Sequence, residues 1–435
     1  MKNSMPNSAR TRRDCGQVLV LFVLLMVVLI LFVGLGIDLG FSYITRAELS
    51  KSVDAAALMG AKSLSQGRDA AEAVAYSTFD LNYGVSSRDA EAPHVDVQPF
   101  TDANNNEVVH VTATVNINTF FIRVLPHWST LAVAADAEAT RANVIMTLVL
   151  DTSGSMDPSR GPGGTGTGSG GGQYLPGAVT TFINNFDDTH DQAAVVSFAT
   201  IPKNIFFGGS PARPQPTQPF RNAIVTDVNA FTWDGYTFSQ GGLANALVIE
   251  NNATIPVNES VVKVVVFCTD GLANIIQGTF DCPPSTILNF GGKDSCDGGP
   301  GVNFCDSITG KLLCSNVVDG AVPPCCPGAT NGFFSAATGI MEPFACTDVT
   351  AEARFRAVQV ARQMRDAGII VYSIGVGTGI DLNFLQQVAN DPALAGTLGY
   401  RPTQRDGQAV VANDVSQLGI VFQQIADKIL FRLTK

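Results

Sequence analysis

A run of branched apolar residues ends in a group of oxygen-bearing side chains. Residues 144–150 read Val-Ile-Met-Thr-Leu-Val-Leu, which predicts a buried strand of a parallel sheet. Asp151, Ser153 and Ser155 follow at spacings of two residues. A carboxylate and two hydroxyls are hard donors suited to Mg²⁺, Mn²⁺ or Ca²⁺, and open α/β sheets bind ligands at such strand ends. The alternative is that Asp151 and Ser153 cap a following helix.

Two further segments bring oxygen donors to the same predicted sheet. Residues 261–268 form a second run typical of a buried strand and lead into Thr269 and Asp270. Thr237 lies just before a predicted helix whose first turns contain the Gly-Gly-Leu of residues 241–243. A second strand therefore ends in a carboxylate, and a loop supplies a third hydroxyl.

These segments resemble the von Willebrand factor A (vWA) family, whose metal-ion-dependent adhesion site reads Asp-x-Ser-x-Ser. The Thr-Asp-Gly of residues 269–271 is similar to the motif of that family's fourth strand. The resemblance covers most of residues 143–432. It implies that two serines and one threonine bind the metal, with two aspartates behind them. The implied site residues are Asp151, Ser153, Ser155, Thr237 and Asp270.

Strands and helices are predicted to alternate from residue 143 onward, as in a doubly wound α/β domain. We predict a vWA-like or Rossmann-like domain with a mainly parallel sheet over residues 143–433. Its other predicted strands are residues 193–198 and 369–374. Its other predicted helices are residues 176–186, 354–367 and, closing the domain, 415–430.

The N-terminal segment predicts a membrane anchor. Residues 18–37 are apolar and uncharged, and twenty helical residues span about 30 Å, the thickness of the hydrocarbon core. Residues 1–17 contain four basic residues and are predicted to stay in the cytoplasm. The rest of the chain would then lie outside the inner membrane, in the periplasm or beyond. A cleaved signal peptide is the alternative, although its apolar region usually has only about 7–15 residues.

The segment after the anchor, residues 38–142, is predicted to be a helical stalk followed by a small α+β module. Helix 69–82 and strands 94–97, 108–117 and 131–139 form the module. Gly16, the Ile-Asp pair at residues 37–38 and the Asp-Ala-Ala-Ala-Leu-Met-Gly-Ala of residues 54–61 resemble TadE/TadG-like Flp (Tad) pilus-assembly proteins. The resemblance implies a role in pilus biogenesis or envelope attachment. The alternative is an ordinary anchor with a helical stalk.

Two insertions interrupt the vWA-like segment. The Gly-rich residues 161–172 lack the Gly-Lys-Ser/Thr of a phosphate loop and predict a flexible loop at the rim of the metal site. Residues 274–347 contain seven of the nine cysteines without Cys-x-x-Cys pairs, which favours disulfides over zinc. We expect this lobe to depend on disulfides, because it lacks the apolar periodicity of a core. One odd thiol is free, pairs between chains, or reaches Cys268. The seven are Cys282, Cys296, Cys305, Cys314, Cys325, Cys326 and Cys346.

The net charge of −11 and the absence of a basic stripe argue against nucleic-acid binding. We predict a non-enzymatic module for adhesion or pilus assembly. Its divalent cation would bind an Asp or Glu carboxylate of a partner protein, such as a pilus or envelope component. His190 is the only histidine of the vWA-like segment, so no Ser-His-Asp set is indicated. The alternatives are a metal-assisted hydrolase and a metal-stabilised structural envelope protein without a ligand.

Overall fold

The computed structural model divides the chain into two compact units. One contains Met1–Asp102 and Glu107–Thr140, and the other contains Ala103–Asn106 and Arg141–Lys435. The structure describes residues 15–84, 89–104, 106–124, 128–161, 168–205, 220–253, 255, 260–280, 286–291, 302–309, 312–317, 333–342, 344 and 346–433. The main segment of the second unit begins at Arg141, two residues before the predicted start of the vWA-like domain.

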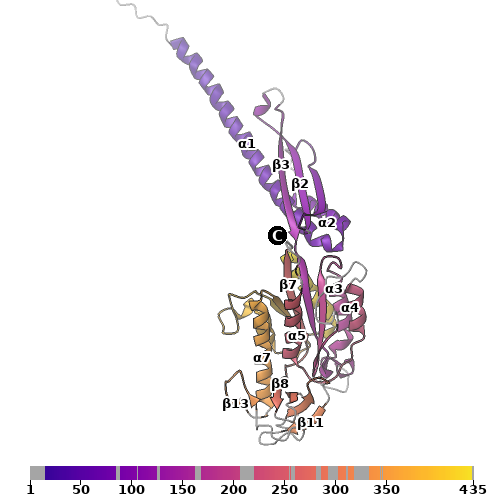
Figure 1. Cartoon of the computed structure of the whole chain (residues 1–435). Helices are drawn as coiled ribbons and strands as arrows, with labels where there is room; N and C mark the ends of the chain where they lie inside the picture. Colours follow the sequence, from indigo (N-terminus) through magenta and orange to yellow (C-terminus); the bar gives the residue numbers. More distant parts are fainter. Residues whose placement is uncertain are drawn as a thin grey trace, which may run out of the picture. The chain divides into compact units, whose positions relative to one another are not determined.

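The first unit is built on one uninterrupted helix, α1 (Cys15–Ser63), as predicted for the stalk. A 3-10 turn leads into α2 (Arg68–Asn82), and a sheet of order β1-β2-β3 follows. The second half of α1 packs on α2 and the sheet through small residues such as Ala57, Ala61 and Ala75 (Figure 1). The strands are β1 (His94–Thr101), β2 (Glu107–Asn118) and β3 (Thr130–Arg141).

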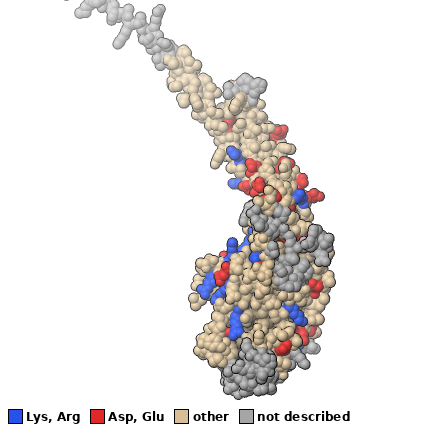
Figure 2. Space-filling view, viewed as in Figure 1, with Lys and Arg blue, Asp and Glu red and all other residues tan. Residues whose placement is uncertain are grey.

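The first half of α1 contributes nothing to that core. Every residue from Leu19 to Val33 is exposed, and this stretch shows no charged side chain on the face seen in Figure 2. Among the helices that the structure describes, α1 alone is long and apolar enough to cross a membrane, with a mean hydropathy of 3.3 over its best window. A bilayer would cover this surface, because apolar surface is costly to leave in water.

The second unit contains a six-stranded sheet of order β15-β14-β7-β4-β5-β6. All neighbouring pairs are parallel except β5 with the edge strand β6. All nine residues of the central strand β4 are buried, as its apolar sequence predicts. The strands are β4 (Asn143–Asp151), β5 (Gln192–Phe198), β6 (Pro202–Asn204), β7 (Val261–Thr269), β14 (Ile370–Val376) and β15 (Gln408–Ala412).

Helices cover both faces of this sheet, which confirms the predicted doubly wound α/β class (Figure 1). Met146 and Leu148 of β4 face one cluster and Val149 faces the other, because successive strand residues point to opposite sides. The first cluster includes α3 (Leu175–Ile183), α4 (Phe220–Asn229) and α9 (Leu418–Leu433). The second includes α5 (Ser239–Asn252), α7 (Cys346–Asp366) and α8 (Leu382–Ala389).

The second insertion was expected to lack an apolar core, but the structure shows that it has one. Phe290 stacks on Phe304 with 5.4 Å between ring centroids, and the Phe344 ring meets the Phe304 ring edge-on at 5.3 Å. This cluster continues into the core beneath α7. The insertion folds into an antiparallel sheet of order β11-β10-β9-β8 and a hairpin of β12 and β13. These strands are β8 (Ile275–Phe280), β9 (Thr286–Gly291), β10 (Val302–Asp306), β11 (Leu312–Val317), β12 (Phe333–Phe334) and β13 (Met341–Glu342).

The predicted disulfides stay a prediction. Cys305 and Cys268 are both buried and free in the part of the chain that is described. The side chains of the other six cysteines of the insertion lie outside that part.

Candidate functional site

The predicted site lies where β4 and β7 end side by side. Leu150 pairs with Cys268 in register, so the residues that follow leave the sheet at the same edge. Asp151 is fully buried there. Its Oδ1 accepts a hydrogen bond from the Ser153 amide at 2.8 Å, and its Oδ2 accepts one from Thr269 Oγ1 at 2.5 Å. The Asp151 side chain therefore ties the two strand ends together.

A chain of hydroxyls runs from this aspartate to the second one. Ser153 Oγ lies 3.1 Å from Ser155 Oγ, and Ser155 Oγ donates to Asp270 Oδ1 at 2.6 Å. The structure thus brings the serines of the first motif to the carboxylate at the end of β7. The contact between Ser155 and Asp270 joins positions that are 115 residues apart in the sequence.

Thr237 reaches the same place from the loop before α5. The Thr237 amide donates to Asn274 Oδ1 at 2.9 Å, and the Asn274 amide donates to the Thr237 carbonyl at 3.1 Å. A methyl group placed on Gly271 would lie 3.5 Å from Thr237 Oγ1 and 3.7 Å from Ser155 Oγ. The two hydroxyls therefore border one space beside Gly271, and all five predicted site residues are brought together.

Three further residues belong to this arrangement although the sequence did not identify them as site residues. Thr269 donates a hydrogen bond to Asp151, and Asn274 accepts one from the Thr237 amide. Ser169, at the end of the Gly-rich insertion, donates from Oγ to Asp270 Oδ2 at 2.5 Å. Its place in the Gly-rich segment that follows the Asp-x-Ser-x-Ser motif was the only signal in the sequence.

The Gly-rich insertion packs closely on the motif at its far end. The Ser169 amide donates to the Ser155 carbonyl at 3.0 Å, and a Cβ on Gly168 would lie 2.4 Å from that same oxygen. Only a glycine allows this approach. The loop predicted at the rim of the site is therefore fixed at residues 168–172, while residues 162–167 lie outside the described residues.

Burial and mutual repulsion disfavour ionisation of the two carboxylates. Burial and, to a smaller extent, the nearby negative charge of Asp270 raise the pKa of Asp151 to about 7. Burial also raises the pKa of Asp270, against hydrogen bonds from Ser155 and Ser169 that lower it. Neither carboxylate forms an ion pair with a described Lys, Arg or His residue. A divalent cation between them would supply the missing positive charge.

The donor set fits a hard divalent cation. It consists of hydroxyl and carboxylate oxygens, the ligands that Mg²⁺, Mn²⁺ and Ca²⁺ prefer. No group of three or more His, Cys, Asp or Glu side chains gathers among the described residues, so a His/Cys zinc centre finds no support there.

The hydroxyls face an open cleft of about 810 Å³. Its lining combines the site residues with apolar side chains of neighbouring loops. Among these residues are Ser155, Ser169, Thr237, Asp270, Leu272, Val376 and Val415. The cleft has room for a side chain of a partner to approach the predicted metal position.

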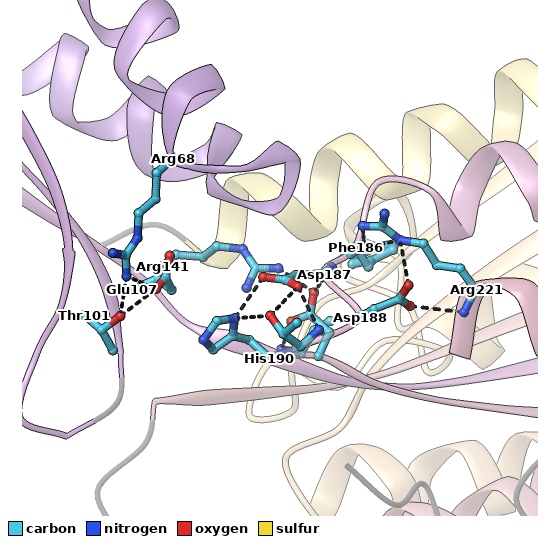
Figure 3. A network of polar contacts seen from close by, with 12 residues as sticks. Arg68, Thr101, Glu107, Arg141, Phe186, Asp187, Asp188, His190 and Arg221 are labelled. Atoms are coloured by element: carbon cyan, nitrogen blue, oxygen red, sulfur yellow. Dashed lines mark hydrogen bonds and ion pairs between the residues drawn. The ribbon is translucent and has the colours of Figure 1, made fainter. Parts of the chain in front are cut away.

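The single histidine of this unit lies at the other edge of the sheet. His190 Nδ1 contacts Asp187 Oδ2 at 2.8 Å, just before β5 begins (Figure 3). Nearby, Asp191 pairs with the buried Arg141 at 2.5 Å and accepts from the Val144 amide at the start of β4. These contacts fix the entry of the chain into the sheet, opposite the site.

The sheet and its oxygen-donor edge define a vWA-like α/β domain, which follows the long N-terminal helix in the sequence. Residues 16–63 match the Tad family model, described as "Putative Flp pilus-assembly TadE/G-like". The prediction of a TadE/TadG-like N-terminal region is thus confirmed. A comparison with curated protein sequences gave no match.

Several solved structures are similar at low identity. The PilB minor pilin from Streptococcus sanguinis is 16% identical, with 78% of this chain and 79% of that chain covered and a TM-score of 0.42. A von Willebrand factor type A protein from Catenulispora acidiphila is 16% identical, with 80% of this chain and 52% of that chain covered and a TM-score of 0.37. The vWF domain of the type V pili tip protein Mfa5 from Porphyromonas gingivalis is 15% identical. That match covers 67% of this chain and 97% of that chain, with a TM-score of 0.40.

Proposed function

We propose that this protein is a membrane-anchored binding module for adhesion or pilus assembly. Its vWA-like domain binds a divalent cation and, through it, a carboxylate of a partner protein. The observation that carries the proposal is the continuous path from Asp151 through Ser153 and Ser155 to Asp270, beside Thr237. This path ends at an open cleft, where a ligand can enter.

The residues divide into two roles in this proposal. Ser153, Ser155 and Thr237 bind the cation directly through their hydroxyls. Asp151 and Asp270 stand behind them, orienting the hydroxyls and balancing the charge of the cation. When bound, the cation supplies an electrophilic position that a carboxylate oxygen can occupy. An Asp or Glu of the partner suits this position, because hard cations favour anionic oxygen.

The proposed topology places this cleft outside the inner membrane. Residues 18–37 of α1 span the bilayer, and the basic residues 1–17 stay in the cytoplasm. The remainder of the chain then faces the periplasm or the extracellular space. A Tad-type N-terminal region and an exposed apolar helix both agree with an envelope location.

We further propose that the site binds and does not catalyse. A hydrolase would place a base close to the reacting water. The histidine available in this unit, His190, is held at the opposite edge of the sheet by Asp187. Asp151 is fully buried behind Ser153, so it cannot reach a substrate in the cleft.

Calorimetric titration of the full chain in detergent with Mn²⁺ or Mg²⁺ tests the proposal. The wild type should bind one ion, and Asp270→Asn should abolish binding or weaken it strongly. Asp157→Asn is the control, because Asp157 follows the Asp-x-Ser-x-Ser motif and its carboxylate accepts from the Ser159 amide in an exposed turn. Equal binding by wild type and Asp270→Asn contradicts the metal site. Capture of envelope proteins with and without chelator then tests the carboxylate partner.

A further inference from the structure

Asp38 joins α1 to a loop that lies 80 residues further along the chain. Its carboxylate accepts three backbone hydrogen bonds, from the amides of Phe120 at 3.0 Å, Phe121 at 2.9 Å and Ile122 at 2.9 Å. Asp38 is almost completely buried by this contact. The contact fixes the loop between β2 and β3 against α1, just past the apolar stretch 18–37.

The same loop also packs on the last turn of the apolar stretch. A Cβ on Gly34 would lie 2.5 Å from the Phe121 side chain, so this glycine lets the phenylalanine ring rest directly on the helix. Gly34 precedes Asp38 by four residues, which is about 6 Å along the helix axis. Phe121 therefore lies at the level where α1 would leave the bilayer.

The loop presents apolar side chains to its surroundings. Phe120 is 54% exposed, Phe121 40%, Val124 75% and Trp128 51%. Thr119 holds the two arms of the loop together, because its Oγ1 donates to the Trp128 carbonyl at 2.6 Å. Arg123 is exposed between these residues, and the sequence has no Asp or Glu from Val108 to Ala135.

We propose that Phe120, Phe121, Val124 and Trp128 insert into the interfacial layer of the bilayer that α1 spans. The inference rests on the membrane anchor of the proposed function and adds a second contact with lipid. Aromatic side chains favour the boundary between headgroups and acyl chains, and Arg123 can extend its guanidinium to the phosphates. The module is then held by the membrane at two points.

Lipid is favoured over a protein partner because the loop is continuous with the surface of the anchor. Asp38 fixes it at the depth where residues 18–37 end, so a bilayer around α1 must meet it. Asp38 also accepts three backbone amides of the loop, so these amides have partners within the protein at that depth.

The test uses the full chain in nanodiscs of phosphatidylcholine and phosphatidylglycerol. Trp233→Phe leaves Trp128 as the only tryptophan, whose emission reports its surroundings. Replacing the lipid with brominated phosphatidylcholine should remove most of this emission, and acrylamide should quench it poorly. The control carries Trp128→Phe, Trp233→Phe and Phe100→Trp. Position 100 pairs with Val108 at the other end of β2, so this tryptophan should respond to acrylamide and not to bromolipid.

The possible outcomes distinguish a failure of the proposed membrane anchor from a failure of the proposed contact between the loop and lipid. If the protein stays on the discs but Trp128 behaves like the control, the loop is not in lipid and the inference is overturned. Protection from acrylamide without quenching by bromolipid means that protein covers the loop, which also overturns it. A chain that leaves the discs without detergent overturns the anchor itself, and the inference with it. Asp38→Asn should lower bromolipid quenching without detaching the protein, since α1 is unchanged.

Discussion

Asp151 and Asp270 end neighbouring parallel strands, and the hydroxyl of Ser155 donates a 2.6 Å hydrogen bond to the second of them. Both carboxylates are buried, and the structure gives neither a cationic side chain as partner among the described residues. Two such groups side by side destabilise a fold unless a proton or a metal ion neutralises them. The stability of this protein should therefore respond to metal and to pH together.

The effect of Mg²⁺ on thermal stability should increase with pH. The pKa of Asp151 is about 7 in the fold and about 3.9 in an unfolded chain. The metal-free protein binds more protons when folded, so this group costs stability as pH rises from about 4 to 7. The rise in Tm with Mg²⁺ should thus be larger at pH 8 than at pH 5.5. Melting curves of wild type and Asp151→Asn check this, and an equal Mg²⁺ response in both proteins would argue against it.

Ser169→Ala should weaken metal binding without unfolding the domain. Ser169 donates to Asp270 Oδ2 and so orients a carboxylate that supports the predicted ligands. Loss of such a supporting contact typically costs about tenfold or more in affinity. Titration with Mn²⁺ measures the change. Ser159→Ala, in an exposed position of the preceding turn, serves as the control and should bind like wild type.

Glu250→Gln should stabilise the protein at alkaline pH. Glu250 is fully buried on α5, where Thr147 Oγ1 donates to its Oε1 at 2.7 Å. Burial raises the pKa of Glu250 to about 8, while Thr147 and Lys263 act in the opposite direction.

Because the pKa of Glu250 is higher in the folded than in the unfolded protein, its ionisation lowers the free energy of unfolding as pH rises from about 4.5 to 8. Glutamine cannot ionise and avoids this loss. Urea unfolding should show little difference between wild type and Glu250→Gln at pH 5. At pH 9 the variant should be more stable by on the order of 2 kcal/mol. The exposed Asp427→Asn is the control. A difference that does not vary with pH would contradict an ionisation effect.

Phe304→Ala should destabilise the insertion even under reducing conditions. Phe304 is fully buried between Phe290 and Phe344, and removing such a ring costs about 3–5 kcal/mol. Phe334, which is 59% exposed, provides the control as Phe334→Ala. Unfolding curves with and without reductant measure both effects. If reductant alone produced the full loss, disulfides and not the aromatic core would hold the lobe.

The parts of the site that the sequence predicts are those encoded by local patterns. Apolar runs ending in Asp151 and Asp270 identify two strands, and parallel strands bring their ends to one edge. Ser169 and Asn274 escape such reasoning because their contacts depend on loops whose paths no periodicity specifies. The aromatic core of the insertion was missed for a similar reason. Its phenylalanines come from separate segments in a Gly-rich and Asn-rich background, so no single segment appears apolar.

The connection of β3 to β4 has a mechanical consequence. β3 ends at Arg141, and β4 starts at Asn143 and ends at the candidate site. In the proposed function, tension between the membrane anchor and a partner bound at that site would pull β4 along its own axis. β4 is hydrogen-bonded to β5 on one side and β7 on the other, so two ladders would have to shear at once before the strand could slide. The central strand is placed to bear load.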